Sequence, residues 1–180
     1  MFQDEAGFGR ISDPSNCWAP PKIRPIVPNQ RVREYKTVYG AVSPLDGDSF
    51  FMVLEKSNTE NMSIFMAELS KKYPDVLILL CMDNASWHKS NDLKIHKNIE
   101  RFFIPPRTPE MNPIEIVWRE IRKHGFKNQI FDSIDAVVQR FNDVISQYIT
   151  NDKITSLTLW PWVEKAYNTR ISVSRISIAD

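Results

Sequence analysis

The sequence is poor in cysteine and histidine, and no part of it is apolar for long. Its 180 residues include two cysteines, Cys17 and Cys81, and three histidines. Neither set has the spacing of a disulfide framework or a structural zinc site. The longest wholly apolar run, residues 76–82, is far shorter than a membrane span. Acids occupy the amino terminus, where a signal peptide is basic and then apolar. These absences exclude a disulfide scaffold and a membrane protein, and they favour a reducing, cytoplasmic setting.

An excess of charge of one sign is missing too. The chain has 23 Lys and Arg against 22 Asp and Glu, for a net charge of +1. Any binding of nucleic acid must therefore rest on local basic patches. The hydrophobic fraction of 42% and the charged fraction of 25% are ordinary for a globular protein. The length suits one domain with a real core, which we expect to span residues 1–180.

Apolar patterns and turn residues predict five strands and several helices. The expected strands are residues 2–5, closed by Gly7 and Gly9, a hairpin of residues 36–43 and 49–56, and the runs 76–82 and 99–104. The expected helices are residues 58–73, a short polar helix at 89–98, one beginning near Asn112, and one at 133–150. We expect residues 172–180 to be frayed or a short strand.

The order of these elements predicts the topology of the sheet. The first three strands follow one another closely and can form an antiparallel meander. The last two are reached through helical crossovers and should lie parallel to a neighbour. The sequence therefore predicts an α/β fold with a mixed five-stranded sheet and helices on both sides.

Residues 11–35 predict a long irregular loop, because they contain five prolines. No acid lies between the first of these prolines and Arg33, and the basic residues of this stretch are Lys22, Arg24, Arg31 and Arg33. Long ordered loops in compact domains tend to be functional. These side chains are candidates to bind DNA or a partner subunit. A solvated connection with ordinary surface charge is the alternative.

Residues 102–123, FFIPPRTPEMNPIEIVWREIRK, contain a strand end, a proline-rich connection and a helix start. Asn112 suits the N-cap and Pro113 the first helical position. The apolar stripe of this helix contains Ile114, Val117, Trp118 and Ile121. Glu115 lies at the edge of the stripe and has two interpretations. It bonds back to the N-cap as in a capping box, or it reaches across the rim of the sheet.

Three acids lie at related positions of the predicted fold. Asp4 ends the first strand, Asp83 ends the fourth, and Glu115 opens the helix after the fifth. If the first and fourth strands are parallel neighbours, Asp4 and Asp83 share one sheet edge, where ligands of α/β folds bind. Converging carboxylates repel unless a cation neutralises them. Their oxygens suit Mg²⁺ or Mn²⁺. Two such ions activate a water or 3′-hydroxyl and stabilise the leaving oxygen of a phosphodiester.

Each acid has a structural alternative. Glu5 could replace Asp4 in the site, but adjacent strand residues face opposite sides, so only one of the two can serve. Asp83 and Asn84 are also candidates to cap the helix that follows.

Three blocks of the sequence resemble the signature blocks of mariner-like DDE transposases, and most of all their bacterial insertion-sequence branch. They are DE at 4–5, DNASWH at 83–88 and PPRTPEMNPIEIVWREIRK at 105–123. The resemblance implies an RNase H-like catalytic core in which Asp4, Asp83 and Glu115 hold two Mg²⁺ or Mn²⁺ ions. It further implies hydrolysis at transposon ends and strand transfer into target DNA, usually at TA. It also implies a homodimer in the synaptic complex and a location in the bacterial cytoplasm.

Two features depart from the family pattern. Residues 84–114 separate Asp83 from Glu115, which is 31 residues and slightly fewer than usual. The family also carries an N-terminal helix-turn-helix region that recognises transposon ends, and we expect this chain to lack it. Specific end binding by this polypeptide alone is therefore in doubt.

Secondary roles fall to residues near these blocks. Asn84 and His88 are candidates to orient a ligand or contact phosphate, with an exposed helix start as the alternative for His88. The basic residues around the third acid, which can hold phosphates or be plain surface charge, are Arg107, Arg119, Arg122 and Lys123. Three functions remain open: a transposase core, a nuclease of the same fold without strand transfer, and an inactive remnant that binds DNA or dimerises.

Overall fold

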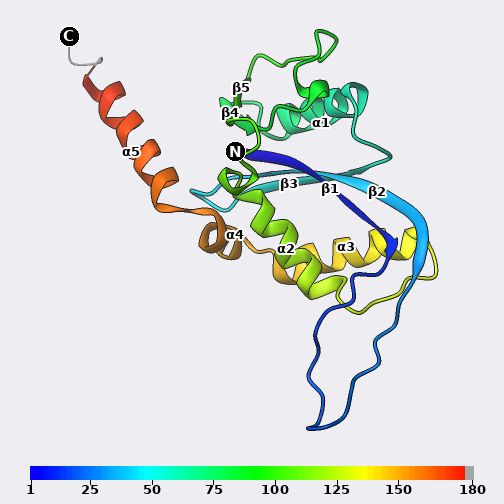
Figure 1. Ribbon diagram of the computed structural model, residues 1–180. Coiled ribbons are helices and arrows are strands. Elements are labelled where there is room, and N and C mark those ends of the chain that lie inside the picture. The colour runs from blue at the N-terminus through cyan, green and yellow to red at the C-terminus, as the bar shows by residue number, and fades with distance from the viewer. Residues whose placement is uncertain (177–180) are drawn as a thin grey trace.

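The computed structural model describes residues 1–176, and its centre is one mixed sheet in the order β3-β2-β1-β4-β5 (Figure 1). The strands are β1 (Phe2–Ile11), β2 (Arg31–Val42), β3 (Ser49–Leu54), β4 (Ile78–Met82) and β5 (Ile99–Phe103). β1, β2 and β3 pair antiparallel, while β4 lies parallel to both β1 and β5. The predicted five-stranded mixed sheet is thereby confirmed.

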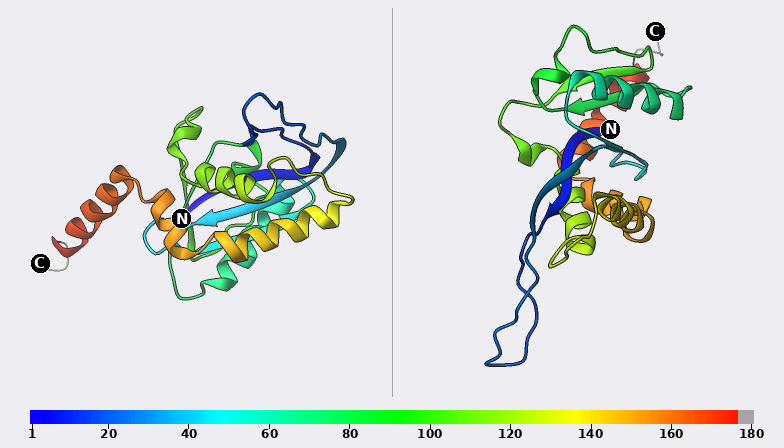
Figure 2. Two further views of the ribbon diagram at one scale, coloured as in Figure 1. Left: turned by 90° about the horizontal axis from the view of Figure 1, so that it is seen from below. Right: turned by 90° about the vertical axis from the view of Figure 1, so that its right-hand side faces the viewer.

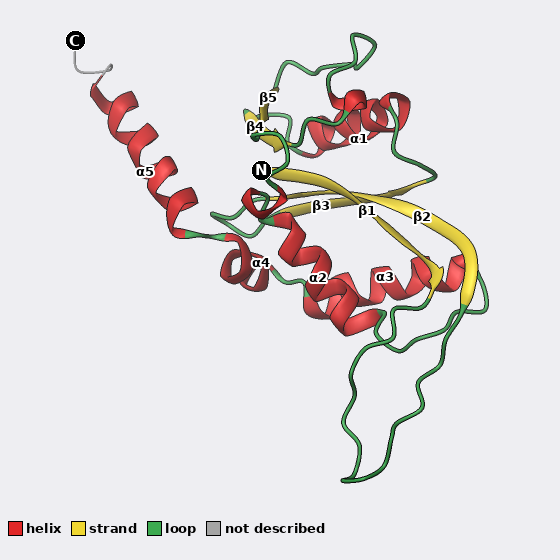
Figure 3. Cartoon of the chain, viewed as in Figure 1, coloured by secondary structure: helices red, strands yellow, loops and turns green. Residues whose placement is uncertain are grey.

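Helices cover both faces of this sheet (Figure 3). The described part of the chain contains α1 (Thr59–Lys72), α2 (Ile114–Gly125), α3 (Ile134–Tyr148), α4 (Asn151–Thr158) and α5 (Pro161–Ile176), with short 3-10 turns η1 (Ser86–His88) and η2 (Pro109–Met111). α1 lies on one face, and α2, α3 and α4 lie on the other. α5 projects away from the body in Figure 1 and in the left view of Figure 2. None of the helices described here combines the length and apolar character that a membrane crossing requires.

Each face has its own apolar core, built from the periodic residues of its helices. α1 begins at Asn58, whose side chain accepts from the N–H of Asn61, and it buries Met62, Phe65, Met66 and Leu69 against the sheet. On the other face, Trp118 of α2 and Phe141 of α3 pack edge-on around Phe8 of β1. Ser133 caps α3 through the N–H of Ala136. These caps and helices confirm the expectation from helical spacing.

The first strand is longer than expected, and the loop after it is shorter. β1 continues through both glycines to Ile11, and β2 already begins at Arg31, so the irregular loop is residues 12–30. Arg31 and Arg33 therefore lie on a strand. Gly9 does not break β1, because its missing side chain lets the strand approach β2: a Cβ there would lie 2.2 Å from the Glu34 oxygen.

Two further expectations are wrong. Residues 89–98 form turns rather than a helix, because polar side chains capture the backbone: the N–H of Asp92 donates to Ser90 Oγ at 3.2 Å, while Leu93 is buried against the α1 face. The end of the chain is helical through Ile176, and the remainder of the expected frayed segment, residues 177–180, lies outside the described residues.

Gly40 of β2 gives a test of the packing under α2. A Cβ at this position would lie 2.5 Å from Trp118 Cη2 and 3.0 Å from Ile114 Cδ1. We expect Gly40→Ala to lower the free energy of unfolding by about 1–3 kcal/mol through overpacking, measured by urea denaturation. Gly7→Ala is the control, since a Cβ there meets nothing within 4 Å. Equal stability of the two variants would contradict this description of the core.

Candidate active site

The pairing of β1 with β4 brings Asp4 level with Asp83. The two strands are in register at Phe2 and Cys81, so Asp4 and Asp83 each follow two residues later on the same side. The prediction that Asp4 ends the first strand is wrong, because β1 continues along β2 to Ile11. β4 ends at Met82, and the chain leaves the sheet beside Asp4. The site therefore lies where one strand stops next to another that continues.

Asn112 attaches the start of α2 to β1. It is buried, and its Nδ2 donates to the Gln3 carbonyl at 3.0 Å. Its side chain is therefore not the predicted N-cap, and Pro113 occupies that position. The N–H of Asn112 donates to the Pro109 carbonyl at 2.9 Å, so Glu115 does not complete a capping box. The bond to β1 determines where the first turn of α2 lies, and with it Glu115.

All three predicted acids line one cleft of about 360 Å³, together with Asn84, Arg107 and the proline-rich segment that leads into α2. Burial raises the pKa of Asp4 to about 7, and the charges of Glu115 and Glu5 add to this effect. Trp118 opposes it, because its Nε1 donates to Asp4 Oδ2 at 3.1 Å. Asp4 and Glu115 thus form a like-charged pair inside the cleft.

Asp83 is held by a buried histidine. His88 Nδ1 lies 2.8 Å from Asp83 Oδ1, and its Nε2 lies 2.9 Å from Glu5 Oε1. Burial alone lowers the pKa of His88, but the hydrogen bond to Glu5 and the charges of Glu5 and Asp83 outweigh it and raise the pKa above its ordinary value. A protonated His88 donates to both carboxylates. The histidine is therefore not the exposed helix start that was the alternative.

Glu5 acts on the opposite face of β1 from Asp4. Its Oε1 also accepts from Gln3 Nε2 at 3.1 Å and from Trp87 Nε1 at 3.4 Å. Glu5 thus supports Asp83 through His88 rather than replacing Asp4. Sequence reasoning weighed Glu5 only as an alternative to Asp4. The signal for its real role was the alternation of the strand combined with the nearby Trp87 and His88.

The donor chemistry of the cleft suits a hard divalent cation, because carboxylate oxygens dominate it and Asp4 lies beside another acid. Across residues 1–176, however, no three Asp, Glu, His or Cys side chains are already gathered at metal-binding distance. The Asp83 carboxylate is engaged by His88 at 2.8 Å and by the N–H of Ala85 at 2.9 Å.

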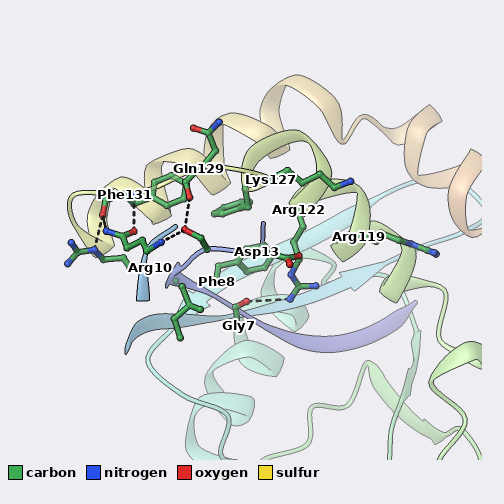
Figure 4. Close-up of a pocket in the computed structure, with 14 residues that line it drawn as sticks. Gly7, Phe8, Arg10, Asp13, Arg119, Arg122, Lys127, Gln129 and Phe131 are labelled. Atoms are coloured by element: carbon green, nitrogen blue, oxygen red, sulfur yellow. Dashed lines mark hydrogen bonds between the residues drawn. The ribbon is translucent and has the colours of Figure 1, made fainter. Parts of the chain in front are cut away.

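Of the other predicted site residues, two line the cleft and the rest lie elsewhere. Asn84 lines it and donates to the Ile104 carbonyl. Arg107 also lines it, with a left-handed backbone at φ 62°. Lys123 pairs with Glu120 at 3.4 Å instead of facing the cleft. The remaining basic residues lie in the exposed loop (Lys22, Arg24), on β2 (Arg31, Arg33), or on α2 beside a second pocket (Arg119, Arg122; Figure 4).

A sheet of this order with these helices is an RNase H-like fold. Residues 1–138 match the family described as DDE superfamily endonuclease, and the chain belongs to that family.

Among its relatives is the uncharacterized protein y4pE/y4sA of Sinorhizobium fredii (strain NBRC 101917 / NGR234). It is 34% identical over 134 residues, which cover 72% of this chain and 97% of that protein.

Solved structures of the Mos1 transposase share the fold. The paired-end complex with the left transposon end matches at a TM-score of 0.66 and 14% identity, covering 87% of this chain and 50% of the Mos1 chain. A mariner Mos1 paired-end complex with Mn matches at 0.63 and 14% identity, over 86% and 49% of the two chains. One with Mg matches at 0.60 and 16% identity, over 87% and 51%. This chain therefore spans about half the length of these Mos1 chains.

The raised pKa of Asp4 predicts how stability depends on pH. Between about pH 4 and pH 7 the folded protein holds a proton on Asp4 that the unfolded chain has released, so stability falls as the pH rises through this window. Asp4→Asn removes this penalty, which is up to about 4 kcal/mol. We expect the variant to melt at a higher temperature than the unmodified protein at pH 8 and at a similar temperature at pH 4.

Glu120→Gln is the control of opposite sign. The hydrogen bond from Lys153, and then those of its other basic neighbours, lower the pKa of Glu120 to about 2. Its contribution to stability is present above the unfolded pKa and lost as the pH falls toward 2, so the Gln variant should be less stable at pH 8. Loss of stability in Asp4→Asn at pH 8 would contradict the view that the ionised Asp4 destabilises the fold.

Glu5→Ala tests the buried network under Asp83. The change leaves the buried His88 and Gln3 with an unpaired donor each, and the half-buried Trp87 also loses an acceptor. We expect a loss of about 3–5 kcal/mol in unfolding free energy. Glu115→Ala, at an exposed position of α2, should change it by less than about 0.5 kcal/mol. Chemical denaturation measures both, and a stable Glu5→Ala variant would show that the network does not hold His88.

Proposed function

We propose that this chain is the catalytic core of a transposase, which hydrolyses phosphodiesters at transposon ends and joins the freed 3′ ends to target DNA. One observation carries the proposal: Asp4, Asp83 and Glu115, from three distant segments, line a single cleft in a chain of the DDE superfamily endonuclease family. All three are proposed as catalytic residues.

The same residues are proposed to hold two Mg²⁺ or Mn²⁺ ions. Such ions supply activation of the attacking hydroxyl and charge stabilisation at the leaving oxygen. Hydrogen bonds fix the positions of two of these carboxylates. Trp118 positions Asp4 through its Nε1, and His88, held by Glu5, orients Asp83. Arg107 lies in the cleft, where its guanidinium is suited to bind a phosphate. Asn84 lines the same cleft beside Asp83.

DNA and a second copy of the chain are the proposed partners. The similar Mos1 structures are complexes with transposon ends, including a strand transfer complex. The loop of residues 12–30 supports contact with DNA or a partner subunit, because Trp18 is fully exposed and Lys22 and Arg24 lie near it. Recognition of specific ends is proposed to need a helix-turn-helix region in addition to this core. The proposed location is the bacterial cytoplasm.

Strand transfer distinguishes this function from simple hydrolysis. The test supplies pre-cut transposon ends and supercoiled target DNA with Mn²⁺. Joined products support a transposase, and nicking without joining supports a nuclease of the same fold. An inert remnant would show neither activity and no rise in melting temperature with Mg²⁺ or Mn²⁺.

Asp83→Asn tests the site directly. Asp83 is about half exposed, and Asn keeps an acceptor oxygen toward His88, so we expect the unfolding free energy to fall by no more than about 1–2 kcal/mol. Cleavage should fall by roughly 10²–10³-fold or more, because a proposed ligand of the ions that stabilise the developing charge is lost. Mn²⁺ should also stabilise this variant less than it stabilises the unmodified protein. Undiminished cleavage by a folded Asp83→Asn protein would refute the assignment.

A further inference from the structure

A second pocket, of about 280 Å³, lies along α2 beyond the cleft (Figure 4). β1 forms one side of it from Gly7 onward, and α2 with the segment after it forms the other. Its basic lining residues include Arg119, Arg122 and Lys127, while Asp13 is the acid among the lining residues. The pocket is therefore cationic in a chain whose overall charge is nearly balanced.

Arg122 is held in place but keeps most of its donors. Its guanidinium lies 5.0 Å from the centre of the Phe8 ring, and its Nη2 donates to the Gly7 carbonyl at 3.4 Å. Phe8 is buried, and the space above Gly7 is open. An arginine has five N–H donors, so a positioned guanidinium with one weak bond can still bind a phosphate through two of them.

The other basic residues of α2 and β1 show which charges remain available. Arg10 is occupied by Glu34 at 2.7 Å and by the Phe131 carbonyl at 2.8 Å. Lys123 is occupied by Glu120. Arg10 also lines the pocket, but Glu34 neutralises it. Within residues 1–176, no carboxylate lies within ion-pair distance of the other three lining cations, Arg119, Arg122 and Lys127.

Shared lining residues link this pocket to the cleft. Glu115 lines both the cleft and a shallow hollow that it shares with Arg119, and Arg119 also lines the second pocket. Residues 115, 119 and 122 share one face of α2. The seven residue steps from Glu115 to Arg122 span about 10.5 Å at 1.5 Å per residue.

The wall beside the pocket is fixed by hydrogen bonds to the base of the long loop. The side-chain amide of Gln30 accepts from the Phe131 N–H at 3.0 Å and donates to its carbonyl at 2.9 Å. Asn128 makes the same reciprocal pair with the backbone of Ser15. Because these contacts exist before any ligand binds, binding costs little additional ordering.

We propose that one face of α2, from Glu115 to Arg122, and Lys127 just after the helix form a nucleic-acid track, in which Arg119, Arg122 and Lys127 bind backbone phosphates of the strand that leads away from the cleft. The inference rests on the proposed function in taking DNA as the ligand. Lys127 is a member that the sequence did not single out, and Lys123 is excluded although it lies on the same helix.

Fluorescence anisotropy of the full chain with a labelled single-stranded DNA 20-mer tests the track. The measurement is made in EDTA from 50 to 200 mM salt. The triple variant Arg119→Gln, Arg122→Gln, Lys127→Gln should bind at least about tenfold more weakly at 50 mM salt, and the slope of log K against log salt should fall by about 2. If the triple variant does not fold, Arg119→Gln with Lys127→Gln should still lower the slope by about 1.4.

Lys123→Gln is the matched control, because it removes the same charge from the same helix. Its affinity should change by less than about twofold. Equal losses in the control and the track variants, or equal binding of poly-glutamate, would overturn the assignment of a nucleic-acid track. So would the absence of salt-dependent binding in the unmodified chain.

Asp83→Asn separates this proposal from the catalytic one. It should bind the 20-mer as tightly as the unmodified protein in EDTA while failing to cleave. If the unmodified chain cleaves but the track variants bind the 20-mer as tightly as it does, the track is wrong and the catalytic function stands. If binding depends on the track but no cleavage occurs with Mn²⁺, the track stands and the catalytic function falls.

Discussion

A short parallel contact between β1 and β4 sets the position of the candidate site. Phe2 and Cys81 are in register there, and the N–H of Cys81 donates to the Met1 carbonyl at 2.8 Å. Because β4 ends one residue later while β1 continues, Asp83 leaves the sheet beside Asp4. α2 then reaches the same place through Asn112, which bonds to the backbone of β1. Without the hydrogen bond from Asn112 to β1, nothing would hold Glu115 near Asp4.

Adjacent acids of β1 have opposite environments, and this difference separates structural from chemical roles. Glu5 accepts from Gln3, Trp87 and His88, so its charge is well compensated. Asp4 accepts from Trp118 but faces Glu115, and its pKa is raised. A carboxylate that destabilises the fold where it stands is typical of a functional position, because selection for stability alone would remove it. On one face of β1 the charge of Asp4 is therefore disfavoured, while on the other face hydrogen bonds stabilise the charge of Glu5.

Much of the fold followed from local patterns, and the failures have identifiable causes. Helical spacing located α1, α2 and α3, and apolar patterns together with turn residues located the strands, although β1 and β2 were predicted too short. Gly9 suggested a strand end, but only the partner strand reveals that glycine there permits close approach. Residues 89–98 looked helical, yet local side-chain bonds and the burial of Leu93 favour turns. Asn112 has the composition of a cap, while its amide is used by β1.

The sequence alone determined the class of the fold, the three acids and the blocks that contain them, because strand and helix periods and short motifs are local properties. The tertiary structure decided which face each acid occupies, that His88 holds Asp83, and that Arg119, Arg122 and Lys127 line a pocket joined to the cleft. These features depend on strand register and on helix packing between segments more than 80 residues apart, such as Glu5 with His88 and Gln3 with Asn112. Such contacts leave no periodic trace in the chain itself.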